Sequence, residues 1–105
     1  MKTYDVRFRP RARRDLIALY RYLKRRFGED SAIGYVRRID EACAGLEQAP
    51  QRGTVVRHPD LTLRVLGFER RVSVLFQIGE DTVEILRVLY GGQDIQAIND
   101  RFSAS

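Results

Sequence analysis

The sequence predicts an α+β domain in which a helical hairpin packs on one face of a small antiparallel sheet, in the order β-α-α-β-β-β. Two apolar stripes with helical spacing occupy the first half of the chain, and three strand-like runs occupy the second half. The links between elements are short, so neighbours along the chain are expected to be neighbours in space. The 105 residues contain no repeat or linker, so residues 1–105 are expected to form a single domain.

The first strand is expected over residues 4–8, where Tyr, Val and Phe alternate with Asp and Arg. Pro10 suits the first turn of a helix, because its missing N–H group would have no helical partner there. The helix is expected to run to Phe27 and to end at Gly28. Its apolar stripe consists of Leu16, Tyr20, Leu23 and Phe27.

A second helix is expected to have Ser31 as its N-cap and to continue to about Ala49, before Pro50. Its apolar stripe consists of Ala32, Val36, Ile39, Cys43 and Leu46, widened by Ile33, Tyr35 and Ala42. About three residues, 28–30, join the two helices, which predicts an antiparallel hairpin. Cys43 is expected to be a buried thiol. As the only cysteine it can form no internal disulfide and no cysteine-based metal site.

The second half of the chain predicts an antiparallel meander. A polar loop over residues 51–60 precedes strands expected at residues 61–66, 70–78 and 82–90. The tail from Asp94 to about Phe102 is expected to form a last short helix, and the first strand could join either edge of the meander or pair inside it. The strand at 70–78 is expected to place Val72, Val74, Phe76 and Ile78 under the helices. Arg71, Ser73, Leu75 and Gln77 would then lie on an open face.

The position of Arg87 depends on the turn at residues 79–81. A three-residue turn pairs Ser73 with Arg87 and places Arg87 beside Arg71 on the open face. A two-residue turn shifts the register by one and directs Arg87 into the core, where an unpaired guanidinium is strongly unfavourable. The longer turn is therefore favoured unless an acid such as Glu69 or Asp94 pairs with Arg87. Arg87 is expected either to tie the sheet to the tail or to bind a phosphate or carboxylate.

The charge of the chain is positive and unevenly distributed. Nineteen basic residues against fourteen acidic ones give a net charge of +5, and all the basic residues except Lys2 and Lys24 are arginines. Residues 1–52 hold thirteen of the basic and seven of the acidic residues. A basic surface of this kind suits nucleic acid or an acidic protein, although a solvated helix face has the same composition. No apolar run approaches the roughly 18 residues of a membrane span and no signal peptide is recognised, so we expect a cytoplasmic protein without membrane association.

Several motifs follow one another in an order shared with one protein family. Residues 4–8 lead into Pro10-Arg-Ala-Arg-Arg-Asp15-Leu16, and Ala49-Pro50-Gln-Arg-Gly53 contains a Pro-x-x-Gly turn. Residues 68–76 resemble a strand with the pattern Arg-Tyr-x-Ile-x-Tyr. The most specific segment is Val83-Glu-Ile-Leu-Arg87-Val-Leu-Tyr90-Gly91-Gly-Gln-Asp94. Together these motifs resemble the RelE/ParE superfamily of bacterial type II toxins, over nearly the whole chain. The last segment is similar to the ParE branch, where a His often stands at the place of Tyr90.

The resemblance to the ParE branch implies the toxin of a type II toxin–antitoxin system with a role such as plasmid stabilisation. The best-known members of this branch poison DNA gyrase by binding, so no enzymatic activity, cofactor or metal is expected. The expected target-binding residues are Arg11, Arg14, Arg21, Arg71 and Arg87.

Two alternatives to a gyrase poison remain open. The RelE branch cuts messenger RNA on the ribosome, which requires charge stabilisation at the phosphate and proton transfer. Arg64, Arg71 and Arg87 would then stabilise charge, and Tyr90 would donate a proton. His58 is the only histidine and lies in a loop, so the chain offers few acid–base groups for this proton transfer. The other alternative is a basic domain that binds nucleic acid without toxicity, although the open sheet face carries mostly aliphatic side chains.

Both toxin branches imply a cognate antitoxin, ParD-like for the ParE branch, and toxin–antitoxin assemblies of higher order. The positive charge of the chain would attract an acidic partner. The partner segment is expected along the helical hairpin and the nearby sheet edge. The candidate contacts are Tyr20, Tyr22, Leu23 and Tyr35. Tyr20 and Leu23 are better explained as core residues, whereas Tyr22 lies off the stripe that contains Leu16 and is the best candidate.

Overall fold

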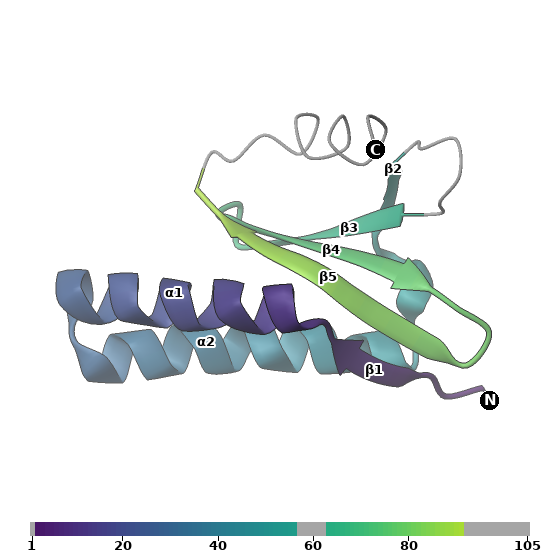
Figure 1. The fold of residues 1–105 in the computed structure, drawn as a ribbon, viewed down its shortest axis with the longest axis horizontal. Coiled ribbons are helices and arrows are strands. Elements are labelled where there is room, and N and C mark those ends of the chain that lie inside the picture. The colour runs from purple at the N-terminus through teal and green to yellow at the C-terminus, as the bar shows by residue number, and fades with distance from the viewer. Residues whose placement is uncertain (1, 57–62, 92–105) are drawn as a thin grey trace.

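Two antiparallel helices cover one face of a five-stranded sheet in the computed structural model, which describes residues 2–56 and 63–91 (Figure 1). The elements are β1 (Asp5–Phe8), α1 (Pro10–Phe27), α2 (Glu29–Ala44), β2 (Thr54–Val56), β3 (Leu63–Phe68), β4 (Val72–Ile78) and β5 (Thr82–Tyr90). Single turns of 3₁₀ helix at Gly45–Glu47 and Pro50–Arg52 connect α2 to β2. The predicted α+β class is confirmed, with one strand, β2, in the segment predicted to be a loop.

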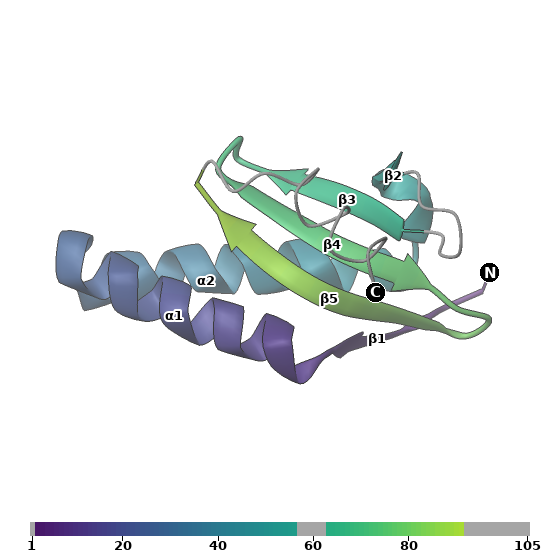
Figure 2. The same cartoon turned by 45° about the horizontal axis from the view of Figure 1, so that its top comes forward.

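The sheet is mixed, with the strand order β1-β5-β4-β3-β2. β1 lies at one edge and pairs parallel with β5, from Asp5 opposite Thr82 to Phe8 opposite Ile85. The other strands form the expected antiparallel meander. The prediction of a purely antiparallel sheet is wrong for β1. A parallel pair needs a long connection between its strands, and here the whole hairpin and the meander supply it (Figure 2).

α1 has the predicted boundaries because both ends carry strong local signals. Pro10 occupies its first turn, and Gly28 follows its last residue with φ 93°, a left-handed value that suits glycine. The residues that α1 buries are Ala12, Leu16, Leu19 and Leu23. Phe27, predicted on the buried stripe, is 60% exposed, because the end of the hairpin extends beyond the sheet (Figure 1).

α2 begins at Glu29, two residues before the predicted N-cap Ser31. Gly28 joins the two helices by itself, and its carbonyl accepts a hydrogen bond from the N–H of Ala32 at 3.1 Å. The left-handed backbone of Gly28 reverses the chain within one residue, so the predicted three-residue link and the Ser31 cap are both wrong. α2 ends at Ala44 rather than at the predicted Ala49, since the chain tightens there into the 3₁₀ turns.

The main core lies between the hairpin and the sheet. The residues of β4 and β5 that it buries are Val72, Val74, Phe76, Val83, Ile85 and Val88, which confirms the predicted inner face of β4. The opposite face is not open as expected, because Leu63, Leu75 and Leu89 are at most 2% exposed in a second apolar cluster. The predicted helix over residues 94–102 and His58 lie outside the described residues.

Cys43 is fully buried in the main core, and this burial raises the pKa of its thiol to about 12 from the usual 9.0. We expect no reaction of native protein with Ellman's reagent at pH 8 and one equivalent in denaturant. The stability that the neutral thiol contributes is complete below the unfolded pKa and is lost as pH rises from about 9 towards 12. Cys43→Ala should lack this part of the alkaline loss, and rapid labelling of the native protein would contradict the prediction.

Candidate functional site

The turn between β4 and β5 decides where Arg87 lies. Ile78 pairs with Val83, and the N–H of Gly79 donates to the carbonyl of Thr82 at 2.7 Å, so Glu80 and Asp81 form a two-residue turn. The favoured three-residue turn is therefore wrong, and the register beside the turn is that of the two-residue alternative. Phe76 pairs with Ile85 and Leu75 with Arg87, which leaves Leu86 as the extra residue of a β-bulge. The bulge changes the direction of the strand just beyond its pairing with β1, where the edge of β5 meets α1.

Arg87 binds Asp15 of α1 at this edge. The Nε of Arg87 donates to Oδ2 of Asp15 at 2.8 Å, and its Nη2 donates to Oδ1 at 3.2 Å. The backbone N–H of Val88 also donates to Oδ2 of Asp15, at 2.9 Å. The two side chains are 15% and 12% exposed, so this ion pair is largely shielded from solvent. The expected exposed position of Arg87 beside Arg71 is therefore wrong, and its acidic partner among the described residues is Asp15 rather than Glu69. Asp94, the other predicted partner, lies outside the described residues.

Arg64, the second arginine considered for catalysis, is engaged by backbone oxygens. Its Nη1 donates to the carbonyl of Gly53 at 2.9 Å and to the carbonyl of Gln51 at 3.2 Å. These bonds hold the 3₁₀ turn before β2 against β3. These contacts give Arg64 a structural role.

Arg71 lies immediately after a tight turn between β3 and β4. The N–H of Arg71 donates to the carbonyl of Phe68 at 3.1 Å. The two residues between them, Glu69 and Arg70, have φ values of 49° and 60°, as in a type I′ hairpin turn. Such turns favour Asn and Gly, so this pair of charged residues is held in an unfavourable backbone conformation.

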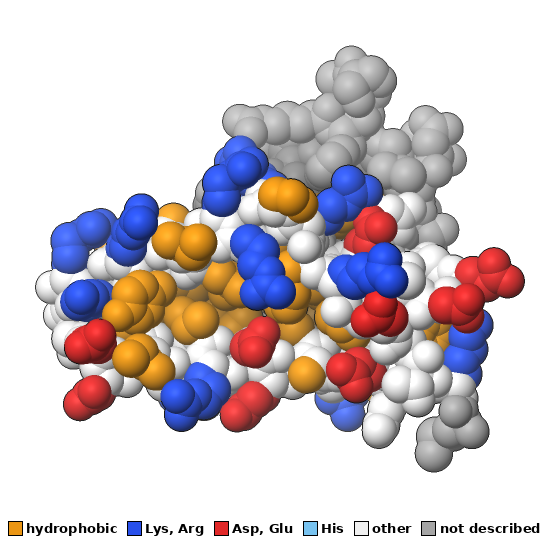
Figure 3. All heavy atoms as spheres, turned by 60° about the horizontal axis from the view of Figure 1, so that its bottom comes forward, with side chains coloured by type: hydrophobic (Ala, Val, Ile, Leu, Met, Phe, Trp, Pro, Cys, Tyr) orange, Lys and Arg blue, Asp and Glu red, His pale blue; other side chains and the backbone are white. Residues whose placement is uncertain are grey.

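A hollow between α1 and α2, on the side away from the sheet, forms the first candidate site. This outer groove has a volume of about 540 Å³ and is lined by Arg13, Leu16, Ile17, Tyr20, Ile33, Val36, Arg37 and Asp40. Its apolar floor and charged rim are visible in Figure 3. Ile17 and Ile33 are 49% and 38% exposed, which is unusual for large apolar side chains on adjacent helices.

A second hollow lies at the end of the hairpin, against the ends of β4 and β5. This tip cleft has a volume of about 430 Å³ and is lined by Leu23, Phe27, Ser31, Tyr35, Arg38, Arg71 and Tyr90. The ring of Tyr90 is 5.7 Å from that of Tyr22 and 6.3 Å from that of Tyr35. Burial, followed by the negative charge of Glu69, raises the pKa of Tyr35.

The four residues predicted to contact an antitoxin separate into two groups. Tyr20 lines the outer groove, whereas Leu23 and Tyr35 line the tip cleft, and Tyr22 contacts the tip cleft through Tyr90. Leu23 is also a buried core residue. Sequence reasoning missed Ile17 as a groove residue, although its position one residue after Leu16 places it beside the buried stripe.

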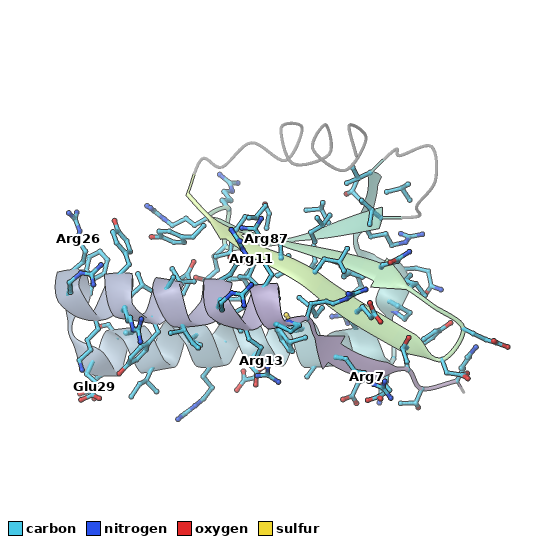
Figure 4. The ribbon with its side chains drawn as sticks, viewed as in Figure 1. Arg7, Arg11, Arg13, Arg26, Glu29 and Arg87 are labelled. Carbon is cyan, nitrogen blue, oxygen red and sulfur yellow. The ribbon has the colours of Figure 1, made fainter. Side chains whose placement is uncertain are left out.

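The predicted target-binding arginines do not form one cluster. Arg14 and Arg21 are exposed on α1. Arg11 lies next to Arg87, with its Nε 3.7 Å from Oδ1 of Asp15, whereas Arg13 points away from the sheet (Figure 4). Arg71 lines the tip cleft instead.

Neither a metal site nor a membrane-spanning helix is found in the part of the chain that the structure describes. No group of three or more His, Cys, Asp or Glu side chains is placed to hold a metal ion among residues 2–56 and 63–91. No helix within the same ranges has the length and apolar character needed to cross a bilayer.

Comparison with known proteins identifies the family of this fold. Residues 6–95 match the family described as the ParE toxin of the type II toxin-antitoxin system parDE. A chromosomal ParDE toxin–antitoxin system from P. aeruginosa contains a similar chain, with 25% identity and a TM-score of 0.74, over 85% of this chain and 97% of that one. The RelBE2 toxin–antitoxin complex from Mycobacterium tuberculosis contains another, with 27% identity and a TM-score of 0.66, over 89% of this chain and 97% of that one. A comparison with curated proteins gave no match. Since the family match spans most of the sequence, the chain belongs to the ParE toxin family of type II toxin–antitoxin systems.

Proposed function

We propose that this protein is a toxin that poisons DNA gyrase by binding and that a cognate antitoxin neutralises it. The observation that carries the proposal of binding rather than catalysis is the engagement of Arg87 by Asp15. The guanidinium is held at 2.8 Å and 3.2 Å by a carboxylate, which already neutralises much of its positive charge inside the protein. It is poorly placed to stabilise the developing charge of a phosphate in RNA cleavage.

The remaining residues considered for RNA cleavage also support binding over catalysis. Arg64 is held by two carbonyls, and Arg71 and Tyr90 line the tip cleft, away from Arg64. General acid–base cleavage needs a proton donor and acceptor within hydrogen-bond reach of one phosphate. These four side chains do not converge on one point. A ribonuclease of the RelE type is therefore the second candidate.

We expect the purified chain to make gyrase accumulate linear plasmid in the presence of Mg²⁺ and ATP, detected after protein denaturation. Omission of gyrase, or its replacement by topoisomerase I, should remove the linear product. Addition of the antitoxin should prevent its accumulation. Intact plasmid at toxin concentrations that arrest growth in cells would contradict gyrase poisoning, and cleavage of ribosome-bound messenger RNA would then become the leading reading.

The outer groove is the surface that best suits the antitoxin. Its apolar floor includes the half-buried Tyr20 and the exposed side chains of Ile17 and Ile33, which leave apolar surface for a partner to cover. Arg13 and Arg37 add positive charge at the rim, and Asp40 adds one negative charge. An amphipathic segment of an acidic partner would bury its apolar face on this floor and place carboxylates beside the two arginines. Tyr22, which lies against Tyr90, falls outside this surface.

A further inference from the structure

We propose that the tip cleft is a separate binding site for single-stranded nucleic acid, in which one base stacks on the exposed aromatic surface and a neighbouring phosphate binds Arg71. This site is distinct from the outer groove, because the two hollows have no lining residue in common although both lie on α1 and α2. The proposal does not depend on gyrase or on the antitoxin.

The aromatic side chains of the cleft supply the stacking surface. Phe27 is 60% exposed and Tyr22 is 39% exposed, although both are large apolar rings at the end of a helix. Tyr22 lies against Tyr90, which itself lines the cleft with Tyr35. Stacking of a base on such a ring is tolerant of sequence because every base has a flat face. The outer face of the sheet carries aliphatic residues, whereas the exposed aromatic rings of the described residues, Tyr22 and Phe27, lie towards the end of the hairpin.

The charged side chains of the cleft supply the phosphate contact. Arg71 and Arg38 line it, and none of its lining residues is acidic. Arg38 is shared with Glu69, at 3.3 Å, and lies over the ring of Tyr35. Arg71 is exposed and forms no ion pair with any residue in the described ranges. Arg71 is therefore the cation available to an incoming anion.

Two further features suggest that the cleft is built to hold a polar ligand. The hydroxyl of Tyr35 is buried and has no hydrogen-bond partner among the residues described, and an unmet group of this kind is unfavourable. The turn that positions Arg71 holds Glu69 and Arg70 at positive φ, where neither residue is favoured. Unfavourable backbone conformations of this kind cluster at functional sites.

The size of the cleft favours a single strand over a duplex. Its volume of about 430 Å³ is within the range of small-ligand sites, so it can take one base and its sugar phosphate. A base inside a duplex presents only its edge, because both of its faces are stacked on neighbouring bases. An acidic peptide would satisfy Arg71 but would leave the exposed ring of Phe27 without a stacking partner.

The test is fluorescence anisotropy of labelled dT10 and rU10 with the full-length chain at two salt concentrations. Phe27→Ala and Arg71→Ala are each expected to weaken binding by about tenfold, the loss of one stacked base or one phosphate contact. Arg71→Ala should also make the salt dependence shallower, whereas Phe27→Ala should leave it unchanged. The matched controls are Arg7→Ala, an exposed arginine of β1, and Val55→Ala, an exposed apolar residue of β2.

The outcomes separate the proposal from its competitors. Tighter binding of dT10 or of rU10 would identify DNA or RNA as the strand, and equal binding would support the shared chemistry. An equal loss for Arg7→Ala and Arg71→Ala would mean diffuse attraction and would overturn the site. Equal affinity for a blunt duplex, or equal affinity for a glutamate decapeptide that is insensitive to Phe27→Ala, would overturn it too. Gyrase poisoning by Phe27→Ala is read separately, so failure of either proposal leaves the other testable.

Discussion

Asp15→Ala is expected to destabilise the protein by about 2–4 kcal/mol, the loss typical of breaking a shielded ion pair on one side. Asp15 accepts two hydrogen bonds from Arg87 and one from the N–H of Val88. Alanine would leave the Arg87 guanidinium, which is 15% exposed, without its counter-charge. The edge of β5 would also lose the acceptor that satisfies its backbone. Chemical denaturation followed by circular dichroism measures the change.

Asp15→Asn is the matched control for this substitution. Asparagine keeps an oxygen that can accept the N–H of Val88, but it lacks the negative charge that Arg87 requires. We expect the free energy of unfolding of Asp15→Asn to lie between that of wild type and that of Asp15→Ala. A free energy of unfolding for Asp15→Ala within about 0.5 kcal/mol of wild type, the range of ordinary surface changes, would show that the ion pair does not hold α1 to the sheet.

Ile33→Asp is expected to weaken antitoxin binding by at least about a hundredfold, the effect of losing a central interface anchor. The substitution places an unpaired carboxylate on the apolar floor of the outer groove, where a bound partner would exclude water. The fold should be retained because Ile33 is already 38% exposed. Isothermal titration of the antitoxin measures affinity. In cells, co-expressed antitoxin should no longer relieve the growth arrest caused by this variant.

Val55→Asp serves as the control for the groove substitution. Val55 is 52% exposed and lies on β2, at the opposite edge of the sheet from β1. The Val55→Asp substitution introduces the same charge into an exposed apolar position outside the groove. If Val55→Asp and Ile33→Asp reduce the affinity equally, the effect comes from net charge, and the antitoxin does not occupy the groove.

The elements with strong local signals were predictable from the sequence. α1 has both predicted ends because Pro10 and Gly28 act on their own neighbours, and β5 has the predicted range of residues 82–90. The parallel pairing of β1 and the bulge at Leu86 were not predictable from local patterns. Both depend on contacts between segments that are far apart in the chain, as does the pairing of Asp15 with Arg87.

The sequence named some of the residues that line the two hollows but did not predict how they are arranged. Tyr20 and Tyr35 were grouped together because both lie on the hairpin, yet they line different hollows. The hairpin extends past the sheet, so the side chains at its end meet the ends of β4 and β5 rather than the outer groove (Figure 1). Phe27 is exposed because the sheet does not reach the end of the hairpin, and Ile17 is exposed because it faces the outer groove on the side away from the sheet. The helical pattern of the sequence contains neither fact.

The parallel pairing of β1 with β5 also sets the order in which the protein can fold during its synthesis. β1 emerges from the ribosome first, but its hydrogen-bonding partners, Thr82 to Ile85, are among the later residues to be made. Contacts between such distant segments form slowly because a long loop must close first. A ribosome that stops before residue 82 therefore releases a chain with no completed sheet, and so translation itself delays the appearance of the folded protein.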